Sequence, residues 1–254
     1  MSLIRNYHIV KKAKVTHGFF TRLNGFSKND FRSLNCSISN GDNKKLVLKN
    51  RQKALKNLGL QNKKLILINQ IHSSKVVLIN NSNINKKIEA DGIMTSLNNV
   101  VLGILTADCA PIFIYDNKNK FICCVHSGWK GTLKNISKNA IVLFDKNNIS
   151  RKNLTAIIGP CLNSKNYEVD RNFEKKFLIK NKNYSKFFRK KNINKAFFNL
   201  RGLIKYQLKE LGIEKIHNVN LDTYANQKLF FSHRRSKHQN QRTTGRLINL
   251  ISLT

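Results

Sequence analysis

Apolar runs rich in valine, isoleucine and phenylalanine alternate with lysine- and asparagine-rich segments along this chain. Short apolar runs bounded by turn-forming residues are typical of strands in a buried sheet. The pattern predicts strands at 65–79, 100–115, 120–126, 154–159 and 216–221. The segment 116–120, DNKNK, has the composition of a turn, so the strands on either side of it are predicted to lie close together as a hairpin.

Other segments have the apolar periodicity of helices. The pattern predicts helices at 131–146, 171–179 and 199–212, the last ending at Gly212. The prolines and glycines are spread along the chain, and neither a linker nor an internal repeat is present. The sequence therefore predicts a single domain over residues 1–254 of the α+β (mixed α/β) class, with mixed β-sheets flanked by helices.

Basic residues far outnumber acidic ones. The chain has 47 lysines and arginines against 13 aspartates and glutamates, which gives a formal net charge of +34. Such a charge attracts polyanions, but the basic residues are scattered among asparagines, and no nucleic-acid-binding motif accompanies them. The sequence therefore predicts no specific nucleic-acid partner. A basic nucleic-acid-binding protein stays open as the alternative to an enzyme.

The five cysteines are an odd number and include no C-x-x-C pair, in a chain large enough to fold without disulfides. This pattern favours a reducing compartment. The N-terminal segment lacks the continuous apolar stretch of a secretory signal, and no segment reaches the roughly 18 apolar residues of a membrane span. We expect a cytoplasmic protein without a membrane partner.

Three side chains with chemical potential interrupt the apolar strand patterns. Cys109 lies in LTADCAPIFIYD, His126 lies in CVHSGWKG, and His72 lies in NQIHSS. A hairpin would bring Cys109 close to His126, and His72 could complete a Cys/His/His cluster. Such a set suits Zn²⁺ and leaves a fourth position open for water or substrate. The intervals between the three residues match no metal motif, so buried packing residues remain the alternative from the residues alone.

Strand alternation adds a geometric prediction. On extended strands, Gln70 and His72 would share one face, whereas Cys109 and Asp108 would point to opposite faces. We therefore expect Asp108 to cap a backbone turn in preference to orienting a ligand histidine. Asp91, in the motif ADG, is expected to be a turn residue and not a catalytic acid.

Longer motifs occur along the chain in a fixed order: THGFFTRLNGFS, NQIHSSKVV, ADGIMT, LTADCAPIFIYD, VHSGWKGT, IIGPC with YEV, and FFSHRRS followed by TTGR. In this order they resemble the laccase-domain family, also called polyphenol oxidase or peptidoglycan editing factor. Members of that family are described as zinc-dependent purine nucleoside phosphorylases. The resemblance extends over nearly the whole chain, and the combination of ADC, HSGWKG and GPC is its most specific part.

The resemblance implies that His72, Cys109 and His126 are the catalytic residues and the ligands of a Zn²⁺ cofactor. It implies phosphorolysis of adenosine, inosine and S-methyl-5′-thioadenosine to a free base and a ribose or methylthioribose 1-phosphate, with adenosine deamination as a side activity. Purine nucleosides and phosphate would be the partners. The candidate substrate- and phosphate-binding residues are Arg51, Arg234, Arg235, Arg246 and, in the GPC motif, Cys161.

Two alternatives concern the same cluster. Without a metal, Cys109 and His126 could act as a thiol nucleophile and a base in a hydrolase, for example one that edits peptidoglycan precursors. Copper could occupy the site in vitro, but no two histidines lie two positions apart, so the sequence predicts no multicopper centre. Trp129, in SGWKG, is expected to pack against the core in preference to stacking on a purine.

Overall fold

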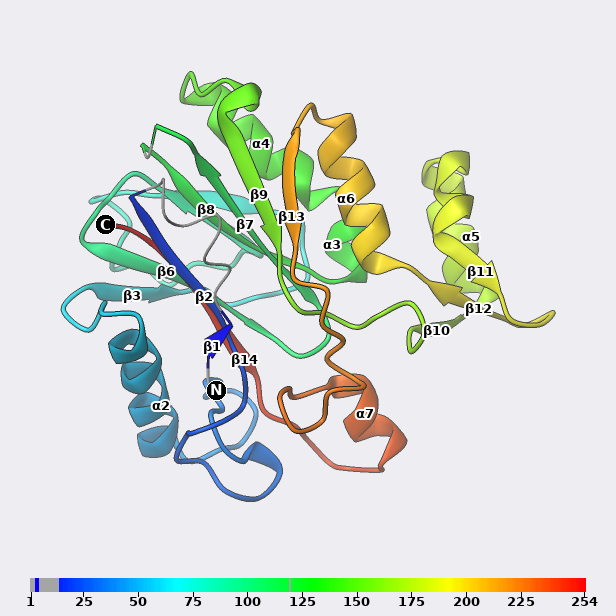
Figure 1. Ribbon diagram of the computed structural model, residues 1–254, viewed down its shortest axis with the longest axis horizontal. Coiled ribbons are helices and arrows are strands. Elements are labelled where there is room, and N and C mark those ends of the chain that lie inside the picture. Colours follow the sequence, from blue (N-terminus) through cyan, green and yellow to red (C-terminus); the bar gives the residue numbers. More distant parts are fainter. Residues whose placement is uncertain (1–2, 5–13, 119) are drawn as a thin grey trace.

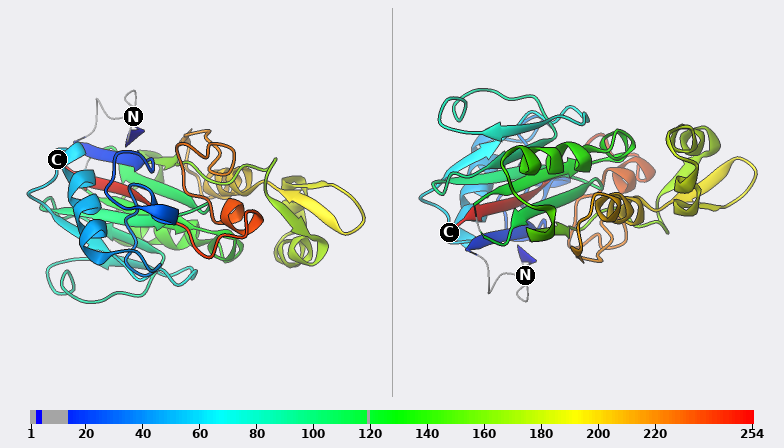
Figure 2. Two further views of the ribbon diagram at one scale, coloured as in Figure 1. Left: turned by 90° about the horizontal axis from the view of Figure 1, so that it is seen from below. Right: turned by 90° about the horizontal axis from the view of Figure 1, so that it is seen from above.

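The computed structural model describes residues 3–4, 14–118 and 120–254, so most of the N-terminal segment considered for a signal lies outside the described residues. Two large β-sheets pack face to face, and helices cover their outer faces (Figure 1). A smaller sheet and a helix form a lobe that projects from one end (Figure 2). The predicted α+β class is confirmed.

The strands form three sheets, and within each sheet the spatial order of the strands differs from their order along the chain. The five-stranded sheet contains, from edge to edge, β1 (Leu3–Ile4), β2 (Val15–Phe20), β14 (Leu247–Leu253), β6 (Val100–Thr106) and β3 (Lys64–Leu67). The six-stranded sheet contains β13 (Lys215–Asn218), β9 (Leu154–Ile158), β7 (Ala110–Asp116), β8 (Ile122–Ser127), β5 (Gly92–Thr95) and β4 (Val76–Ile79). The three-stranded sheet of the lobe contains β10 (Glu168–Asp170), β12 (Lys195–Phe198) and β11 (Phe188–Lys190).

The helices are distributed over both outer faces and the lobe. The α-helices are α2 (Lys44–Asn57), α3 (Trp129–Leu133), α4 (Ile136–Lys146), α5 (Arg171–Lys180), α6 (Leu200–Glu210) and α7 (His233–His238). The short 3₁₀ helices are η1 (Asn29–Phe31), η2 (Arg151–Asn153) and η3 (Lys182–Phe187).

The core between the two large sheets holds them together. Phe19 of β2 and Phe113 of β7 stack with ring centroids 4.5 Å apart and an angle of 11° between the ring planes. Ile104, Ile157 and Ile251 are buried in the same cluster. Strands β7, β8, β9 and β14 are buried along their whole length, which explains why apolar residues predominate at successive positions and do not alternate strictly with polar ones.

Apolar helix faces close the two outer surfaces of this sandwich. Ala140 and Phe144 of α4 and Leu203 of α6 are buried against the six-stranded sheet. Ala54 of α2 and the following Leu58 are buried against the five-stranded sheet. Figure 1 shows α2 on one side of the sandwich and α4 with α6 on the other.

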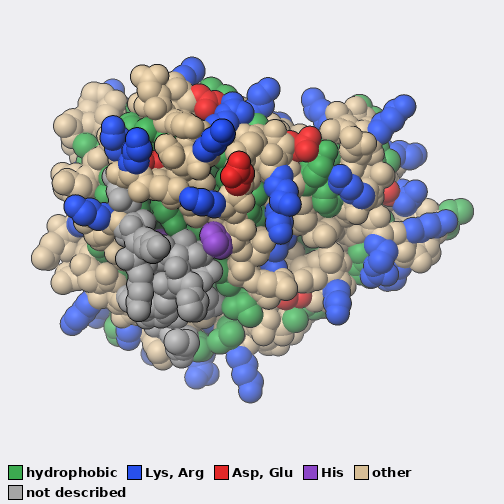
Figure 3. All heavy atoms as spheres, turned by 45° about the horizontal axis from the view of Figure 1, so that its top comes forward, with side chains coloured by type: hydrophobic (Ala, Val, Ile, Leu, Met, Phe, Trp, Pro, Cys, Tyr) green, Lys and Arg blue, Asp and Glu red, His purple; other side chains and the backbone are tan. Residues whose placement is uncertain are grey.

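The basic side chains are spread over the surface. On the face drawn in Figure 3, lysines and arginines occur in many places and do not gather into one patch. Within the part of the chain that the structure describes, no helix is both long enough and apolar enough to cross a membrane.

The predicted strand 65–79 is wrong in extent. β3 ends at Leu67 in the five-stranded sheet, and β4 begins at Val76 in the six-stranded sheet. The run at 100–115 divides in the same way, because β6 ends at Thr106 and β7 begins at Ala110 in the other sheet. Both connections cross between the sheets, and each carries one candidate metal ligand.

The helices predicted at 171–179 and 199–212 are confirmed as α5 and α6, and Gly212 follows α6 with a φ of +79°. The helix predicted at 131–146 is interrupted. Asn135 has a φ of 52°, and its side chain accepts a hydrogen bond from the backbone N–H of Lys138 at the start of α4. This cap separates α3 from α4.

Replacing Phe113 with alanine tests the contact between the sheets. The substitution leaves a cavity beside Phe19, so the free energy of unfolding should fall by about 3–5 kcal/mol. Ile193→Ala, at a side chain that is 82% exposed, should change it by less than about 0.5 kcal/mol. Urea denaturation followed by circular dichroism measures both variants. If Phe113→Ala unfolds with the same free energy as the wild type, the stack does not contribute to holding the sheets together.

Candidate metal centre

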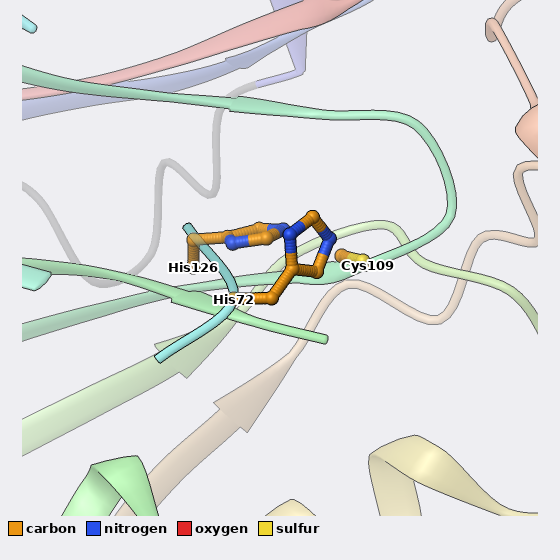
Figure 4. Close-up of side chains that lie close together, drawn as sticks. All are labelled: His72, Cys109 and His126. Carbon is orange, nitrogen blue, oxygen red and sulfur yellow. The ribbon is translucent and has the colours of Figure 1, made fainter. Parts of the chain in front are cut away.

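The three predicted ligands come from three segments of the chain. His72 lies on the loop between β3 and β4, Cys109 lies on the bend between β6 and β7, and His126 lies in β8. In β8, His126 pairs with Pro111 of β7, as the predicted hairpin requires. Figure 4 shows the three side chains close together. The structure thus brings together the residues that the sequence grouped.

The geometry of the cluster is compact and accessible. One ligand atom from each residue lies within 4.8 Å of the other two. The rings of His72 and His126 have centroids 5.0 Å apart and planes at 83°. His126 is buried, Cys109 is half-buried and His72 is exposed, so the cluster has an open side. Among the described residues, this is the one group of at least three His, Cys, Asp or Glu side chains that could hold a metal ion.

The prediction that strand alternation places His72 and Cys109 is wrong, because neither residue lies in a strand. His72 has a φ of +56°, and Asp108, directly before Cys109, has a φ of +86°. Residues with a side chain seldom adopt these left-handed conformations. Both positions lie on connections between strands of different sheets. The two ligands are therefore placed by turns between the sheets and not by the faces of strands.

The Asp91 carboxylate positions two of the three ligands. Its Oδ1 accepts a hydrogen bond from Nδ1 of His126 at 2.8 Å and from the backbone N–H of His72 at 3.0 Å. Its Oδ2 accepts from the backbone N–H and the hydroxyl of Ser73, at 2.5 and 2.8 Å, and from the backbone N–H of Ile71 at 3.3 Å. Asp91 is fully buried, so these donors replace water around its charge.

Two further contacts fix the approach of the loops. The side-chain amide of Gln70 donates to the carbonyl oxygen of Leu105 at 2.8 Å and accepts from its N–H at 2.7 Å. This pair ties the β3–β4 loop to β6 close to Cys109. Gly128 lies against the thiol, where a Cβ would stand 2.8 Å from Sγ of Cys109. Any larger residue at 128 would displace the sulfur.

Ionisation in the cluster favours a thiolate. Burial opposes the charge of Cys109, but the charge of His126 and hydrogen bonds from His126 and His72 outweigh burial and lower the Cys109 pKa to about 6. Burial also opposes the charge of His126, yet Cys109 and Asp91 raise its pKa to about 9. The pKa of Asp91 falls to about 2 because hydrogen bonds from His126 and Ser73 outweigh burial. A metal that binds here must displace the imidazolium proton.

The donor set fits zinc. Two imidazoles and a thiolate are typical Zn²⁺ ligands, and three protein ligands leave one tetrahedral position open. Asp91 occupies Nδ1 of His126, so Nε2 is the ring nitrogen left for a metal. A carboxylate behind a ligand histidine is a common support for bound metals, because it fixes both the tautomer and the ring.

Two cavities border the cluster. The first, about 470 Å³ in volume, we call the aromatic cavity, because Trp129, Tyr167 and Phe173 form part of its wall. The second, about 380 Å³, we call the Arg246 cavity. Both are lined by His72, Ala107, Cys109 and His233. A larger open groove of about 910 Å³ shares no lining residue with the cluster.

Two of the arginines predicted to bind phosphate line these cavities. Arg234 lines the aromatic cavity, and its Nη1 donates to the carbonyl oxygen of Glu168 at 2.8 Å. Arg246 lines the cavity named after it. These two guanidinium groups are therefore close enough to the cluster to meet a substrate there.

The other three predicted substrate-binding residues line neither cavity. Arg235 is buried and donates to three backbone carbonyl oxygens. Arg51 donates to the carbonyl oxygen of Cys36 at 2.8 Å. Cys161 is fully buried, and its Sγ accepts a hydrogen bond from Arg201 at 3.3 Å. In this structure their contacts are with the protein itself.

Asp108 caps a backbone turn, as expected. Its carboxylate accepts from the hydroxyl of Thr223 at 2.7 Å and from the backbone N–H of Arg234 at 2.6 Å, which holds the start of α7. Trp129 packs against Phe173, with ring centroids 5.1 Å apart, as predicted for a core contact. It also lines the aromatic cavity, which its sequence position did not predict.

Asp91 is the residue of the candidate site whose role the sequence interpretation missed. The sequence predicted only a turn at Asp91, whereas in the structure its carboxylate accepts hydrogen bonds from both the His72 loop and the His126 ring. The available signal was an aspartate directly before the fully buried strand β5. A buried carboxylate needs several donors, and such a requirement often marks a structured site.

An α+β domain with an open Cys/His/His cluster between two cavities defines a class of candidate metalloenzymes. Residues 16–254 match the family described as multi-copper polyphenol oxidoreductase laccase. The chain belongs to this family. The resemblance inferred from the motifs is confirmed.

Relatives with assigned names are similar over most of the chain. A Rickettsia conorii protein named purine nucleoside phosphorylase is 36% identical over 175 residues, which cover 68% of this chain and 72% of that protein. A Haemophilus influenzae protein of the same name is 29% identical over 241 residues, 94% of each chain. The crystal structure of the hypothetical protein YfiH from Bacillus licheniformis has a TM-score of 0.89 at 27% identity, covering 99% of this chain and 96% of that one.

Asp91→Asn tests the support of the cluster. The amide cannot accept all five hydrogen bonds, so the affinity for zinc should fall by about 10–100-fold, measured by competition with a chromogenic chelator. Asp116→Asn is a matched control. Asp116 is also fully buried and accepts backbone hydrogen bonds, but at the far end of the β7–β8 hairpin. Asp116→Asn should lower the stability and leave the affinity for zinc unchanged. Equal zinc affinities for the wild type and both variants would refute the role of Asp91.

The pH dependence of Cys109 alkylation tests the ionisation of the site. In metal-free protein, the rate with iodoacetamide should rise with pH and reach half its maximum near pH 6, because the thiolate is the reactive form and the pKa is about 6. For an unperturbed thiol, the rate would reach half its maximum at about pH 8.5. Mass spectrometry separates Cys109 from Cys36 and Cys161, whose pKa values burial raises. A wild-type midpoint near that of a free thiol would contradict the assignment.

Proposed function

We propose that this protein is a zinc-dependent purine nucleoside phosphorylase. Adenosine, inosine and S-methyl-5′-thioadenosine would react with phosphate to give a free base and a ribose or methylthioribose 1-phosphate. Deamination of adenosine would be a side activity. The proposal depends chiefly on the open Cys/His/His cluster, which borders two cavities in a chain whose relatives are named purine nucleoside phosphorylases.

The cluster and its neighbours would share the chemical work. Zinc held by His72, Cys109 and His126 would supply positive charge to a substrate atom at its open position. Asp91 holds the proton on Nδ1 of His126 and so keeps the ring oriented. Fixed cationic side chains in the adjoining cavities can neutralise phosphate and hold it beside the sugar, which lowers the entropic cost of bringing two substrates together.

The remaining predicted residues would act indirectly. Arg235 ties the carbonyl oxygens of Thr223, Tyr224 and Phe230 together behind α7, the helix that carries His233 and Arg234. Arg51 and Cys161 would support the segments around the cavities.

A metal-free cysteine hydrolase is the second candidate, and the ionisation of the cluster favours it. His126 lies between Asp91 and Cys109, and the lowered pKa of Cys109 is the property of an activated nucleophile. His72 distinguishes the two functions, because it completes a metal ligand set, whereas in a thiol–imidazole pair it would add only a supporting hydrogen bond to Cys109. Metal content and His72 variants therefore separate the candidates.

Incubation of the zinc-loaded protein with adenosine, inosine or S-methyl-5′-thioadenosine tests the proposal. We expect release of the base and of the sugar 1-phosphate only when phosphate is present, measured by liquid chromatography. His72→Ala should remove the zinc and lower kcat/KM by about 100-fold or more. His217→Ala, at an exposed histidine of β13 outside both cavities, should leave the zinc content and kcat/KM unchanged.

Two results would contradict the proposal. One is the absence of every phosphate-dependent product with all three nucleosides. The other is a metal-free protein that hydrolyses an acyl substrate, is inactivated by alkylation of Cys109 and is unaffected by His72→Ala.

A further inference from the structure

We propose that the two cavities divide the two substrates, with the purine base in the aromatic cavity and phosphate in the Arg246 cavity. The inference rests on the proposed function and adds which residues select each substrate. It assigns Trp129 to the base. It also assigns phosphate to Arg246 and not to Arg234, although the sequence made both arginines candidates.

Charge distinguishes the two cavities. The aromatic cavity has more carboxylates than cationic side chains in its lining: Asp108, Glu168 and Asp170 against Lys195 and Arg234. Among the described residues that line the Arg246 cavity, none is an aspartate or glutamate, and Arg246 is cationic. A phosphate dianion is repelled by nearby carboxylates, and protein that excludes water strengthens this repulsion. Phosphate therefore belongs in the Arg246 cavity.

Both guanidinium groups donate to described residues only from Nη1, so the two arginines differ in what surrounds them. Arg234 donates from Nη1 to the Glu168 carbonyl oxygen, and its guanidinium carbon lies 5.2 Å from the ring centre of Tyr167. Arg246 uses only Nη1, which donates to two backbone carbonyl oxygens at 2.9 and 3.1 Å. As for Arg234, no described residue accepts a hydrogen bond from its Nε or Nη2, but the guanidinium of Arg246 is not held over an aromatic ring. Those two nitrogens form the edge of a guanidinium that can pair with two phosphate oxygens.

Small polar groups accompany Arg246. The hydroxyl groups of Ser37 and Ser39 lie 3.1 Å apart and line the same cavity. Hydroxyl groups can donate to phosphate oxygens or to the hydroxyls of a ribose. The cavity thus combines one fixed cation with neutral donors, which suits an anion with several acceptor oxygens.

The wall of the aromatic cavity is held from behind. Trp129 packs on Phe173, and Phe173 packs in turn on the fully buried Phe177, with ring centroids 5.2 Å apart. Tyr167 packs on Phe198 of the same lobe, at 5.3 Å. A planar purine can stack on aromatic side chains that are already ordered, so little conformational entropy is lost on binding.

The reaction requires the two substrates to meet at the sugar. An oxygen of hydrogen phosphate forms a bond to C1′, and the C1′–N9 bond breaks with its electron pair going to the purine. The proton of hydrogen phosphate also goes to the purine, so the products are the neutral base and ribose 1-phosphate. The two cavities share His72, Cys109 and His233, and a ribose between base and phosphate would lie beside these residues.

Tryptophan fluorescence gives a direct test of base binding, because Trp129 is the only tryptophan in the chain. With zinc-loaded protein excited at the long-wavelength edge of the tryptophan band, adenine and adenosine should change the emission. Inorganic phosphate alone should not reduce the affinity for adenine. Phosphate binding is measured separately by calorimetry. Neither readout needs turnover, so both remain informative if the protein is not a phosphorylase.

Matched variants separate the cavities. Arg246→Gln, and Arg246→Lys, which keeps the charge but loses the paired donors, should each weaken phosphate binding by about tenfold or more. Both should leave adenosine binding within about twofold. Arg234→Gln should leave phosphate binding unchanged, as should Arg151→Gln, a control at an exposed arginine paired with Asp145. Trp129→Leu should weaken adenosine binding by about tenfold, measured by calorimetry, whereas Trp129→Phe should retain most of it.

Two outcomes would overturn the division. In the first, phosphate binding is lost in Arg234→Gln and kept in both Arg246 variants. In the second, adenosine binds without changing Trp129 emission and binds Trp129→Leu as tightly as the wild type. If both binding patterns hold while no nucleoside is phosphorolysed, the division stands and only the proposed function fails.

Discussion

A single buried carboxylate organises the site. Asp91 has no exposed surface, so its charge is tolerated only because the N–H groups of the His72 loop, the hydroxyl of Ser73 and the ring of His126 all donate to it. The same hydrogen bonds hold His72 in a left-handed conformation and fix the ring of His126. The requirement to satisfy one buried charge therefore determines where two candidate metal ligands lie and which ring nitrogen His126 offers.

The two large sheets supply the rigid frame for this arrangement. Their strands are buried and joined through the Phe19–Phe113 stack, and the chain passes between the sheets at the β3–β4 and β6–β7 connections. Each connection carries one candidate ligand. Gln70 ties the β3–β4 connection to β6, the strand that precedes the β6–β7 connection. Residues on such turns can depart from strand geometry because the strands at either end hold the turn in place. A candidate metal site and two cavities can therefore form beside a well-packed core.

Much of this fold was predictable because buried strands leave short apolar runs, as at β8 and β9, and amphipathic helices leave apolar residues at helical spacing, as at α5 and α6. The division of 65–79 was not, because both halves are apolar and the break depends on Asp91, which follows His72 by 19 residues. Helix α2 was not predicted, since its lysine-rich sequence buries only four residues. The hairpin suggested that Cys109 and His126 meet, but the assignment of His72 as a ligand depended on family resemblance, because its spacing carries no metal motif.

The coordination of zinc in the purified protein tests the central claim most directly. X-ray absorption spectroscopy of the zinc-loaded protein should show one sulfur ligand at about 2.3 Å, two imidazole nitrogens at about 2.0–2.1 Å and one further light-atom ligand at the open position. Cys109→Ala should lose the sulfur contribution. Failure to bind zinc, or a zinc site without sulfur in the wild-type protein, would contradict an open Cys/His/His centre built from His72, Cys109 and His126.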